Sequence, residues 1–528
     1  MLQGFNLIGY RKSISSENFL QAYSPVQQDY LPENFAIATT DEVDSAVMQA
    51  ENAFATYKAC SPEQKANFLE TIAEEINSLG DALINRAMLE TGLPEARLVG
   101  ERGRTTGQLK LFADLLREGS WVEAVIDEAL PDRKPLPRSD LRKMLVPIGP
   151  VVVFGASNFP FAFSTAGGDT AAAFAAGNPV IVKAHESHLG TNEMIGSAIK
   201  TAALKCNMPE GIFSFVVGEG PVTGMQLVKH PGVKAIGFTG SYKAGMAIYK
   251  AAVNEREVPV PVYAEMSSIN PVLILPQRLK AASATVATQL AGSVTLGVGQ
   301  FCTNPGLMFL MNDENAESFI SELKEKLVAA PAGTMLNKNV CNNYYEAKNK
   351  VSKEAGVAVL FEGDNVSGTV KGTAALLKVN AADFISNPQL QTEIFGPSSL
   401  VILCNDQSEM LKALQSLHGQ LTGTIIGNAE DCNNYKDCID VLSSKVGRLL
   451  YNGVPTGVEV CHAMVHGGPF PATTDARATS VGADSIKRFV RPICLQDCPP
   501  EFLPDALKNE NPLGLMRKVN GVYTRGSD

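Results

Sequence analysis

Residues 149–187 read GPVVVFGASNFPFAFSTAGGDTAAAFAAGNPVIVKAHES and carry the pattern that decides the fold. Two short apolar runs, VVVF at 151–154 and VIVK at 180–183, have the length and β-branched composition of buried strands. The small residues over 161–177 predict a helix between them. A strand, a crossover helix and a second strand form a βαβ unit, so we predict a parallel sheet with right-handed crossovers.

The segments on either side of this stretch extend the pattern. Residues 1–40 are extended and rich in turns, and helices are expected over 61–92 and 96–119. The first of these begins with Ser-Pro, which are residue types typical of a helix start. After the quoted stretch, further strands are expected in IFSFVV at 212–217 and VKAIGF at 233–238.

A second α/β region is expected from about residue 260. Its strands are predicted in PVLIL at 271–275, GLMFLM at 306–311, SLVILC at 399–404, TGTIIG at 422–427 and GRLLYNG at 447–453. The predicted class is therefore α/β, with three parts. The first region covers 1–124 and 149–258, the second covers 259–484, and two extended segments cover 125–148 and 485–528.

Composition excludes several functional classes. The 528 residues are 45% hydrophobic and 19% charged, which is typical of a soluble globular protein of two or three domains. A net charge of −10 argues against a nucleic-acid partner. The ten cysteines form no CxxC pair and there are only six histidines, so we expect no metal site of the paired-ligand type.

Location in the cell is expected from the same sequence features. The start, MLQGFNLIGYRKS, has no apolar core of a signal peptide, and free cysteines suit a reducing compartment. The longest apolar region, 146–182, is interrupted by Asn158, Pro160 and Asp169, so no membrane helix is expected. We therefore expect a cytoplasmic protein.

Polar residues and glycines follow the strands of the first region. Ligands bind beyond the carboxyl ends of parallel strands, and backbone amides at a helix start can bind phosphate. One such group is weak evidence, but several at successive strand ends predict a nucleotide site. The residues concerned are Asn158, Lys183, Glu186, Gly218, Gly220, Gly224, Gly240 and Ser241.

Cys302 lies in GQFCTNPG, residues 299–306, and has two alternative interpretations. A free cysteine is usually inert packing, as we expect for Cys60, Cys206, Cys404 and Cys438. The chain also contains, in order, SNFP, VK, FTGS, EMSSINP, GQFC and EIFGP. This ordered set resembles the aldehyde dehydrogenase superfamily over roughly residues 40–490. The resemblance implies the aldehyde dehydrogenase fold, with a cofactor domain, a catalytic domain and a small β oligomerisation extension in the three parts above.

The resemblance implies three catalytic roles. Cys302 corresponds to the nucleophile that attacks an aldehyde. The Asn158 side chain and the Cys302 backbone amide correspond to the donors that stabilise the oxyanion. Glu265 corresponds to the base that activates water, for which we expect a pKa raised by partial burial.

The cofactor residues also follow from the resemblance, which implies NAD or NADP. The residues expected to bind it are Lys183, Glu186, Gly220, Gly240, Ser241, Glu393 and Phe395. Glu186 is placed to accept bonds from a ribose, and the loop 220–226 contains no Lys or Arg. Both features favour NAD over NADP, with NADP tolerated.

Sequence variants narrow the subgroup. SNFPFAFSTAGGD, EMSSINP and HAMVHGGPFP are similar to bacterial dehydrogenases of 2-oxoglutarate semialdehyde, which act in sugar acid breakdown. Two departures from the wider family are Met266-Ser267-Ser268 after the base and Ser157 before Asn-Phe-Pro. The first raises a question about the backbone beside Glu265.

Four residues are expected to contact the substrate, namely Arg104, Gln108, Phe159 and His466. Arg104 and Gln108 are four positions apart and share a helix face, where a guanidinium could bind a substrate carboxylate. The alternative is that Arg104 only bridges helices. His466 is expected either to satisfy a loop hydrogen bond or to tune the thiol or the cofactor.

Other functions remain open at this stage. One is an NADP-dependent fatty aldehyde dehydrogenase, which would favour an apolar tunnel. A CoA-acylating relative lacks the Glu base, and a non-catalytic structural descendant would not need Cys302, Glu265 and Asn158 together. The resemblance also implies a homodimer or homotetramer. The extended segments 121–148 and 486–496 are expected to have few partners within one chain, and in the family the corresponding pieces pair with another subunit.

Overall fold

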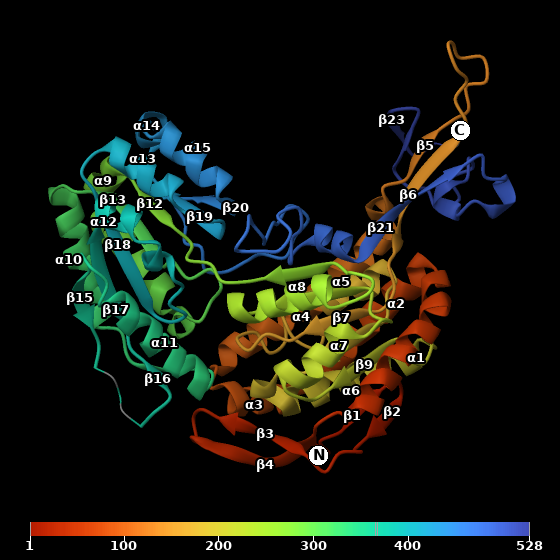
Figure 1. Ribbon diagram of the computed structural model, residues 1–528, viewed down its shortest axis with the longest axis horizontal. Helices are drawn as coiled ribbons and strands as arrows, with labels where there is room; N and C mark the ends of the chain where they lie inside the picture. The colour runs from red at the N-terminus through yellow and green to blue at the C-terminus, as the bar shows by residue number, and fades with distance from the viewer. Residues whose placement is uncertain (1, 365, 367, 527–528) are drawn as a thin grey trace.

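The computed structural model describes residues 2–364, 366 and 368–526. Figure 1 shows two bodies, each built around a sheet, and an arm that projects from the first. Residue 1 of the predicted first region, residues 365 and 367 of the second, and residues 527–528 of the extended segment 485–528 lie outside the described residues.

The first sheet contains the quoted stretch and confirms the predicted βαβ unit. Its strand order is β11-β10-β7-β8-β9-β1-β2, and β11 through β9 are parallel. Val151 pairs with Val180 on one side and with Ala235 on the other. The bounds are β1 Asn6–Ile8, β2 Arg11–Ser13, β7 Val151–Phe154, β8 Val180–Lys183, β9 Phe213–Val216, β10 Ala235–Thr239 and β11 Val262–Glu265.

Alternate side chains of this sheet enter two cores, because successive residues of a strand point to opposite faces. Val151 and Val153 pack with helices on one face, and Val152 and Phe154 pack with helices on the other. The first face is covered by α2 Pro62–Ser78, α3 Gly80–Thr91, α4 Glu95–Glu118, α5 Gly168–Ala176 and α6 Leu189–Lys205. The second is covered by α1 Thr40–Ala59, α7 Met225–Lys229 and α8 Tyr242–Asn254.

The crossover helix of the quoted stretch is shorter than predicted. Residues 161–167 form turns, and α5 begins only at Gly168. The carboxylate of Glu101 accepts hydrogen bonds from the backbone N–H groups of Phe161 and Ala162, and Ser164 donates to Asn192. Hydrogen bonds of this kind favour turns over a helix in residues 161–167, so the helix begins later in the sequence than predicted.

The helix predicted over 61–92 is interrupted. Its start is confirmed, because Ser61 Oγ accepts from Gln64 N at 3.1 Å and Pro62 is the first helical residue. The helix stops before Gly80, whose φ of +56° is left-handed, and α3 then continues in a new direction. The apolar spacing was read correctly, but the change of direction was missed.

The second sheet contains all five strands predicted after residue 260. Its order is β15-β17-β18-β13-β12-β19-β20, and only the edge strand β15 runs antiparallel. The bounds are β12 Val272–Ile274, β13 Leu307–Met311, β15 Ala358–Glu362, β17 Ala375–Asn380, β18 Ser398–Cys404, β19 Gln420–Ile426 and β20 Val446–Tyr451. Its helices are α9 Pro276–Thr295, α10 Glu314–Val328, α11 Lys338–Val351, α12 Ala381–Ser386, α13 Gln407–Gln415, α14 Ala429–Asn434 and α15 Lys436–Ser444.

Two expectations about the connections are corrected. β11 pairs with β10 in the first sheet, although the sequence assigned residues after 258 to the second region. The extended segments do have partners in the chain, because β21 Val490–Gln496 pairs with β6 Leu141–Pro147 along seven residues. They form the arm as a sheet of order β21-β6-β5-β22-β23, with β5 Val125–Asp127, β22 Arg517–Val519 and β23 Val522–Thr524.

Smaller pieces complete the fold. The hairpin of β3 Phe19–Ser24 and β4 Asp29–Ala36 lies below the first body in Figure 1, and β14 Gly333–Thr334 pairs with β16 Lys371–Gly372. Among the described residues, no helix has both the length and the apolar character needed to cross a membrane. The carboxyl ends of β7, β8, β10 and β11 point toward the second body, where the functional residues collect.

Candidate active site

A cavity of about 330 Å³ lies where the two bodies meet. Its walls come from the carboxyl ends of first-sheet strands and from loops and a helix of the second body. The residues that line it include Gly155, Ser157, Asn158, Phe159, Phe163, His185, Gly240, Ser241, Glu265, Met266, Cys302, Asn343, Glu393 and Phe395. The structure therefore brings together most of the residues that the sequence predicted for catalysis and cofactor binding.

The loop that holds Cys302 is fixed by close backbone packing. Gly299 has φ +65°, and a Cβ there would lie 2.3 Å from the backbone of Gly396. Asn270 also holds the loop in place, because its Nδ2 donates to the backbone carbonyls of Cys302 at 2.8 Å and Asn304 at 2.9 Å. The glycine and the amide hold the sulfur at the cavity wall.

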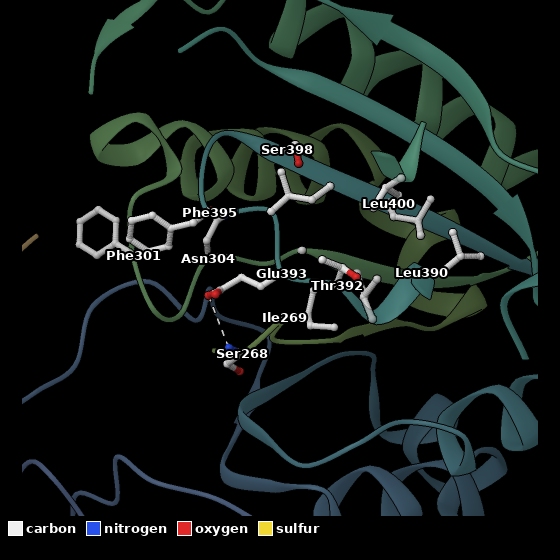
Figure 2. Close-up of a pocket in the computed structure, with 14 residues that line it drawn as sticks. Ser268, Ile269, Phe301, Asn304, Leu390, Thr392, Glu393, Phe395, Ser398 and Leu400 are labelled. Atoms are coloured by element: carbon white, nitrogen blue, oxygen red, sulfur yellow. Dashed lines mark hydrogen bonds between the residues drawn. The ribbon is translucent and has the colours of Figure 1, made fainter. Parts of the chain in front are cut away.

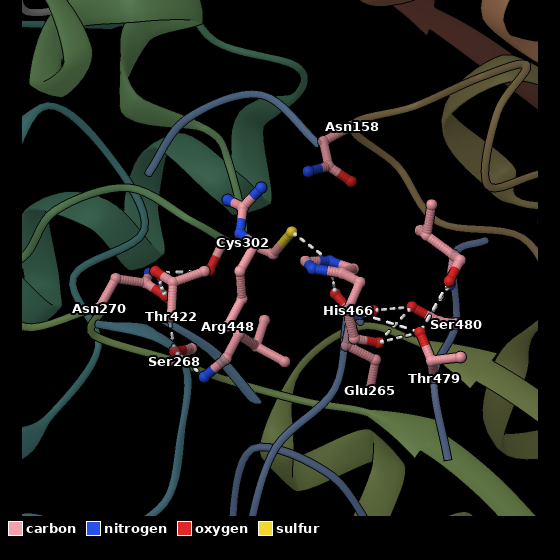
Figure 3. Close-up of polar contacts among 12 residues, drawn as sticks. Asn158, Glu265, Ser268, Asn270, Cys302, Thr422, Arg448, His466, Thr479 and Ser480 are labelled. Carbon is pink, nitrogen blue, oxygen red and sulfur yellow. Dashed lines mark hydrogen bonds and ion pairs between the residues drawn. The ribbon is translucent and has the colours of Figure 1, made fainter. Parts of the chain in front are cut away.

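Cys302, His466 and Glu265 form a compact cluster, which Figure 3 shows. The Cys302 Sγ lies 3.4 Å from His466 Nε2, and the same nitrogen lies 3.0 Å from a Glu265 carboxylate oxygen, Oε1. The other oxygen, Oε2, accepts a hydrogen bond from Ser480 at 2.6 Å. His466 and Glu265 are both buried. One imidazole nitrogen faces both the thiol and the carboxylate, and the thiol also hydrogen-bonds to Glu265, so either group can take the thiol proton and activate the sulfur as a nucleophile.

The electrostatics of the cluster correct one expectation. Burial alone would raise the pKa of Glu265, but His466 and the hydroxyl of Ser480 outweigh it, so the pKa lies below its ordinary value. The raised pKa predicted from partial burial was wrong. Burial and the Glu265 carboxylate instead raise the pKa of the Cys302 thiol well above its usual range. The thiol therefore needs a neighbouring proton acceptor, and both His466 and Glu265 are in contact with it.

Asn158 lies on the opposite wall of the cavity. Its side-chain Nδ2 donates to the backbone carbonyl of Gln300 at 3.1 Å, and the backbone carbonyl of Asn158 accepts from the guanidinium of Arg97 at 2.7 Å. These contacts fix the amide beside the Cys302 loop. One bond uses one of the two Nδ2 hydrogens, so the second can serve a ligand.

Three of the predicted cofactor residues, Lys183, Glu186 and Gly220, lie at or just after the ends of β8 and β9. Lys183 is buried and forms an ion pair with Glu186, and burial lowers the pKa of Lys183 while Glu186 partly offsets this. The carboxylate of Glu219 also acts on Lys183. Gly220 opens a single π-turn at 220–224, where nothing lies within 4 Å of its missing side chain.

Ser241 is the N-cap of α8, at the part of the cavity formed by the end of β10. Its Oγ accepts from Ala244 N at 3.3 Å, and α8 starts at the following residue. The backbone of Gly240 lies close to the ring of Phe238, since a Cβ at this position would lie 2.6 Å from the ring. A capped helix start with a close glycine suits a phosphate, so this end of the cavity fits a dinucleotide.

Glu393 and Phe395 border the other end of the cavity, and both also line a small pocket behind the Cys302 loop in Figure 2. A Glu393 oxygen accepts from Ser268 N at 3.4 Å. Burial raises the pKa of Glu393 to about 7, although bonds from Ser267 and Ser268 oppose this. The carboxyl group is therefore set to change its charge near neutral pH.

Arg104 and Gln108 do not share one surface of the cavity. The Arg104 guanidinium lies over the rings of Phe159 at 5.6 Å and Phe163 at 5.3 Å, and both rings line the cavity. Its Nε and Nη2 have no hydrogen-bond partner in the part of the chain that the structure describes. Gln108 instead points at Gly168, at the start of α5.

Several residues that support the site were missed from the sequence. Ser480 orients Glu265, Arg97 stacks on Phe159 and Phe301, and the Arg448 side chain reaches toward Cys302. They lie on elements far from the motifs, so spacing gave no signal. Of the two histidines in the loop HAMVH, His466 reaches the site, whereas His462 is exposed.

Ser267 and Ser268, which depart from the family pattern after Glu265, hold the backbone beside this residue in place. Ser268 Oγ donates to Asn270 Oδ1 at 2.9 Å and accepts from Leu421 N at 2.9 Å. Ser267 Oγ accepts from Tyr242 N at 3.2 Å. The hydroxyls thus tie the backbone after the base to β19 and α8.

Comparisons with known proteins agree with this geometry. The model of the aldehyde dehydrogenase family matches residues 10–473. Alpha-ketoglutaric semialdehyde dehydrogenase 2 of Azospirillum brasilense is 50% identical over 98% of this chain and 99% of its own. Alpha-ketoglutaric semialdehyde dehydrogenase of Acinetobacter baylyi is 46% identical over 94% of each chain.

Solved structures share the fold. Betaine aldehyde dehydrogenase of Staphylococcus aureus, in complex with NAD⁺, has a TM-score of 0.78 at 18% identity and covers 94% of this chain and 96% of its own. NADP-dependent glyceraldehyde-3-phosphate dehydrogenase of Bacillus halodurans, complexed with NADP, has a TM-score of 0.77 at 20% identity, covering 94% and 100%. The chain belongs to the aldehyde dehydrogenase family, and is an enzyme that oxidises aldehydes with NAD or NADP.

Proposed function

We propose that this enzyme oxidises 2-oxoglutarate semialdehyde to 2-oxoglutarate through a thioester on Cys302, with NAD as its preferred cofactor. The observation that carries the chemistry is the contact of Cys302 with His466 and Glu265 at the wall of the cavity. Identity of 50% and 46% to two proteins named for this substrate supports the choice of aldehyde.

The first half of the reaction uses Cys302, His466 and Asn158. The thiol gives its proton to His466 Nε2, 3.4 Å away, and Sγ bonds to the carbonyl carbon. The carbonyl oxygen becomes an oxyanion, which the Asn158 amide and the Cys302 N–H stabilise, each donor being worth about 3 kcal/mol. NAD or NADP, when bound, would accept a hydride from the substrate carbon. The carbon would then remain bonded to Cys302 Sγ as a thioester.

The second half uses Glu265. The lowered pKa keeps this carboxylate ionised at neutral pH, so it can accept a proton from water. The water oxygen attacks the thioester carbon and the carbon–sulfur bond breaks, which releases the carboxylic acid and the thiolate. The proton on Glu265 returns to the sulfur, and the proton that His466 took from the thiol passes to solvent. Ser480 is a positioning residue here, because its bond to Oε2 directs Oε1 toward His466 and the sulfur.

The cofactor preference follows from charge. Glu186 and Glu219 both act on the single cation Lys183, so these three groups carry a net negative charge. A 2′-phosphate would be repelled there, whereas a ribose hydroxyl could donate to Glu186. We expect a higher kcat/KM with NAD, and Glu186→Thr should shift the ratio toward NADP. A tenfold preference of the native enzyme for NADP would refute this assignment.

The substrate carboxylate is assigned to Arg104. Its guanidinium is held against two cavity rings, and two of its nitrogens lack partners among the described residues. A charge-assisted bond to a carboxylate would satisfy them. Gln108, which points away toward Gly168, is left out of this role.

A substrate panel with an Arg104→Leu variant tests the function. The panel compares kcat/KM for 2-oxoglutarate semialdehyde, succinate semialdehyde, glutaraldehyde, hexanal and decanal. The variant should lose about tenfold to several hundredfold on the acidic aldehydes, from a pair worth roughly 1.5–3 kcal/mol, and little on hexanal. Equal losses on all would make Arg104 structural, and a preference for decanal would favour a fatty aldehyde dehydrogenase.

The family resemblance also supports assignments of the domains, the oligomeric state and the location in the cell. We infer that the cofactor domain covers 1–124 and 149–258 with β11 added, that 259–484 supplies catalysis, and that the arm makes a homodimer or homotetramer. All ten cysteines are free, which supports a cytoplasmic location.

A further inference from the structure

We propose that Cys302, His466 and Glu265 also bind a zinc-type divalent cation, which reversibly switches the enzyme off. The sulfur, one imidazole nitrogen and one carboxylate oxygen all lie within 4.8 Å of one another. They come from three separate elements, the Cys302 loop, the loop after β20 and the end of β11. Cys302 and His466 are 164 positions apart, so no paired-ligand motif indicated the site in the sequence.

The distances suit a tetrahedral zinc ion. Zinc bonds of about 2.3 Å to sulfur and about 2.0–2.2 Å to nitrogen or oxygen place neighbouring ligands about 3.4–3.6 Å apart. Sγ and Nε2 are 3.4 Å apart, and Nε2 and Oε1 are 3.0 Å apart. Side-chain shifts of a few tenths of an ångström would bring these two pairs to the required geometry.

The donor set also selects the kind of ion. Thiolate and imidazole favour zinc and its neighbours over magnesium or calcium, which prefer oxygen ligands. Three protein ligands leave the fourth position open, and because Cys302 and Glu265 line the cavity, water or a ligand there could complete the shell.

The three ligands are held from outside the cluster. Ser480 bonds to Oε2 of Glu265 and leaves Oε1 facing His466. The backbone N–H of His466 donates to Thr479 Oγ1 at 2.9 Å, and Asn270 holds the carbonyl of Cys302. Partners that orient ligands in this way raise metal affinity.

Two features make the binding reversible rather than structural. Nδ1 of His466 has no hydrogen-bond partner among the residues that the structure describes, so its ring lacks the outer contact common in tight sites. The guanidinium groups of Arg104 and Arg448 both act on Cys302, and Glu393 acts on it with the opposite sign. Two nearby cations weaken the hold on a dication, although thiolate and carboxylate neutralise its charge.

Inhibition follows from the chemistry of the sulfur. On binding, the thiol proton leaves to solvent and Sγ forms a bond to the metal, so it can no longer attack an aldehyde. The oxygen of Glu265 that would take a proton from water is also occupied. The metal site itself does not depend on the proposed function, but the inhibition does.

Cobalt(II) serves as the probe, because a four-coordinate cobalt–thiolate centre has a charge-transfer band and intense visible bands. The chelator-treated full chain should show both bands with one cobalt per chain, and zinc should displace the cobalt. Cys302→Ala should remove the charge-transfer band. His466→Asn should weaken cobalt binding by more than the about 10–100-fold typical of an outer contact.

Cys206→Ala is the matched control, because Cys206 is also a partly buried thiol but its sulfur hydrogen-bonds to Thr71 and Asn67, outside the cluster. It should keep the full spectrum. No charge-transfer band, or a band that survives Cys302→Ala or is unchanged by His466→Asn, would overturn the metal site.

Activity is measured in parallel with each aldehyde of the panel. Zinc should inhibit in the same concentration range in which it displaces cobalt, and a chelator should restore the rate. A cobalt spectrum without zinc inhibition would overturn the switch. A cobalt spectrum in a chain that oxidises none of the aldehydes would instead refute the proposed function and leave the metal site standing.

Discussion

At the scale of single residues, chemistry depends on neighbours that the motifs do not contain. The sequence identified Cys302, Glu265 and Asn158, and the structure places all three at one cavity. It left open whether His466 tunes the thiol, and it did not predict that contact with His466 would lower the pKa of Glu265. A pKa depends on burial and on charges brought together by folding, so sequence order cannot supply it.

Replacing Glu265 by Gln separates the two halves of the reaction. The amide cannot accept a proton from water, but Cys302 and His466 remain in place, so the first turnover should proceed. Stopped-flow absorbance should show one NADH per active site followed by a steady rate at least about 100-fold below the native one. Mass spectrometry should find the acyl group on Cys302, and full steady turnover without it would remove Glu265 from the role of base.

Glu393 should make the stability of the cofactor-free enzyme depend on pH. Its pKa of about 7 in the folded chain exceeds the ordinary 4.5, so the folded chain binds more protons than the unfolded chain between these values. Stability therefore falls as pH rises from 4.5 to 7, and the loss is complete above 7. Its upper limit is about 3 kcal/mol, and the partial exposure of the side chain reduces it.

Glu393→Gln tests this dependence, because a neutral amide removes the cost of burying the charge. The variant should unfold at a higher temperature than the native chain at pH 8, and the gain should shrink to near zero at pH 4.5. Exposed Glu501, replaced by Gln, should show no such pattern. A gain that is equal at both pH values would mean that the carboxylate is not the source.

At the scale of elements, the apolar runs located nine of the fourteen strands that the structure describes in the two main sheets and missed β1, β2, β11, β15 and β17, and element ends and breaks depended on tertiary contacts. The crossover helix α5 lost its first turns because Glu101, on α4, binds the backbone of Phe161 and Ala162. The break between α2 and α3 depends on the left-handed backbone of Gly80. Neither the remote carboxylate nor the choice of φ is visible in a local apolar pattern.

Gly80 and Gly100 form a pair that tests this explanation. No atom lies within 4 Å of a Cβ built at either position, so packing does not distinguish them. Gly80 has φ +56°, and Ala there should cost about 1–2 kcal/mol. Gly100 lies inside α4, where Ala should gain about 0.5–1 kcal/mol. Thermal unfolding should shift in opposite directions, and a shift in the same direction would contradict the assignment.

At the scale of the whole molecule, the sequence predicted extended segments but mistook how they are satisfied. We expected 121–148 and 486–496 to have few partners within the chain, yet β6 and β21 pair with each other along seven residues and build an arm with β5, β22 and β23. Residues separated by more than 300 positions form this sheet, and sequence patterns do not report such distant pairings. The arm leaves the first body and extends into solvent (Figure 1).

The surface of the arm predicts assembly. Four large apolar side chains of the arm are each more than half exposed, namely Leu136 at 69%, Phe502 at 73%, Val522 at 67% and Tyr523 at 72%. A monomer would leave these side chains in water, whereas a symmetric partner could cover them and the two edge strands β21 and β23. Light scattering should therefore give the mass of a dimer or tetramer.

A double change, Val522→Lys with Tyr523→Lys, should lower that mass, because two buried charges without partners would oppose association. Val258→Lys is the control, since Val258 is also 69% exposed but follows α8 on the body of the molecule rather than on the arm. It should leave the mass unchanged. A native chain that is a stable, active monomer would refute the assembly, and a double variant of native mass would show that the β23 end of the arm lies outside the interface.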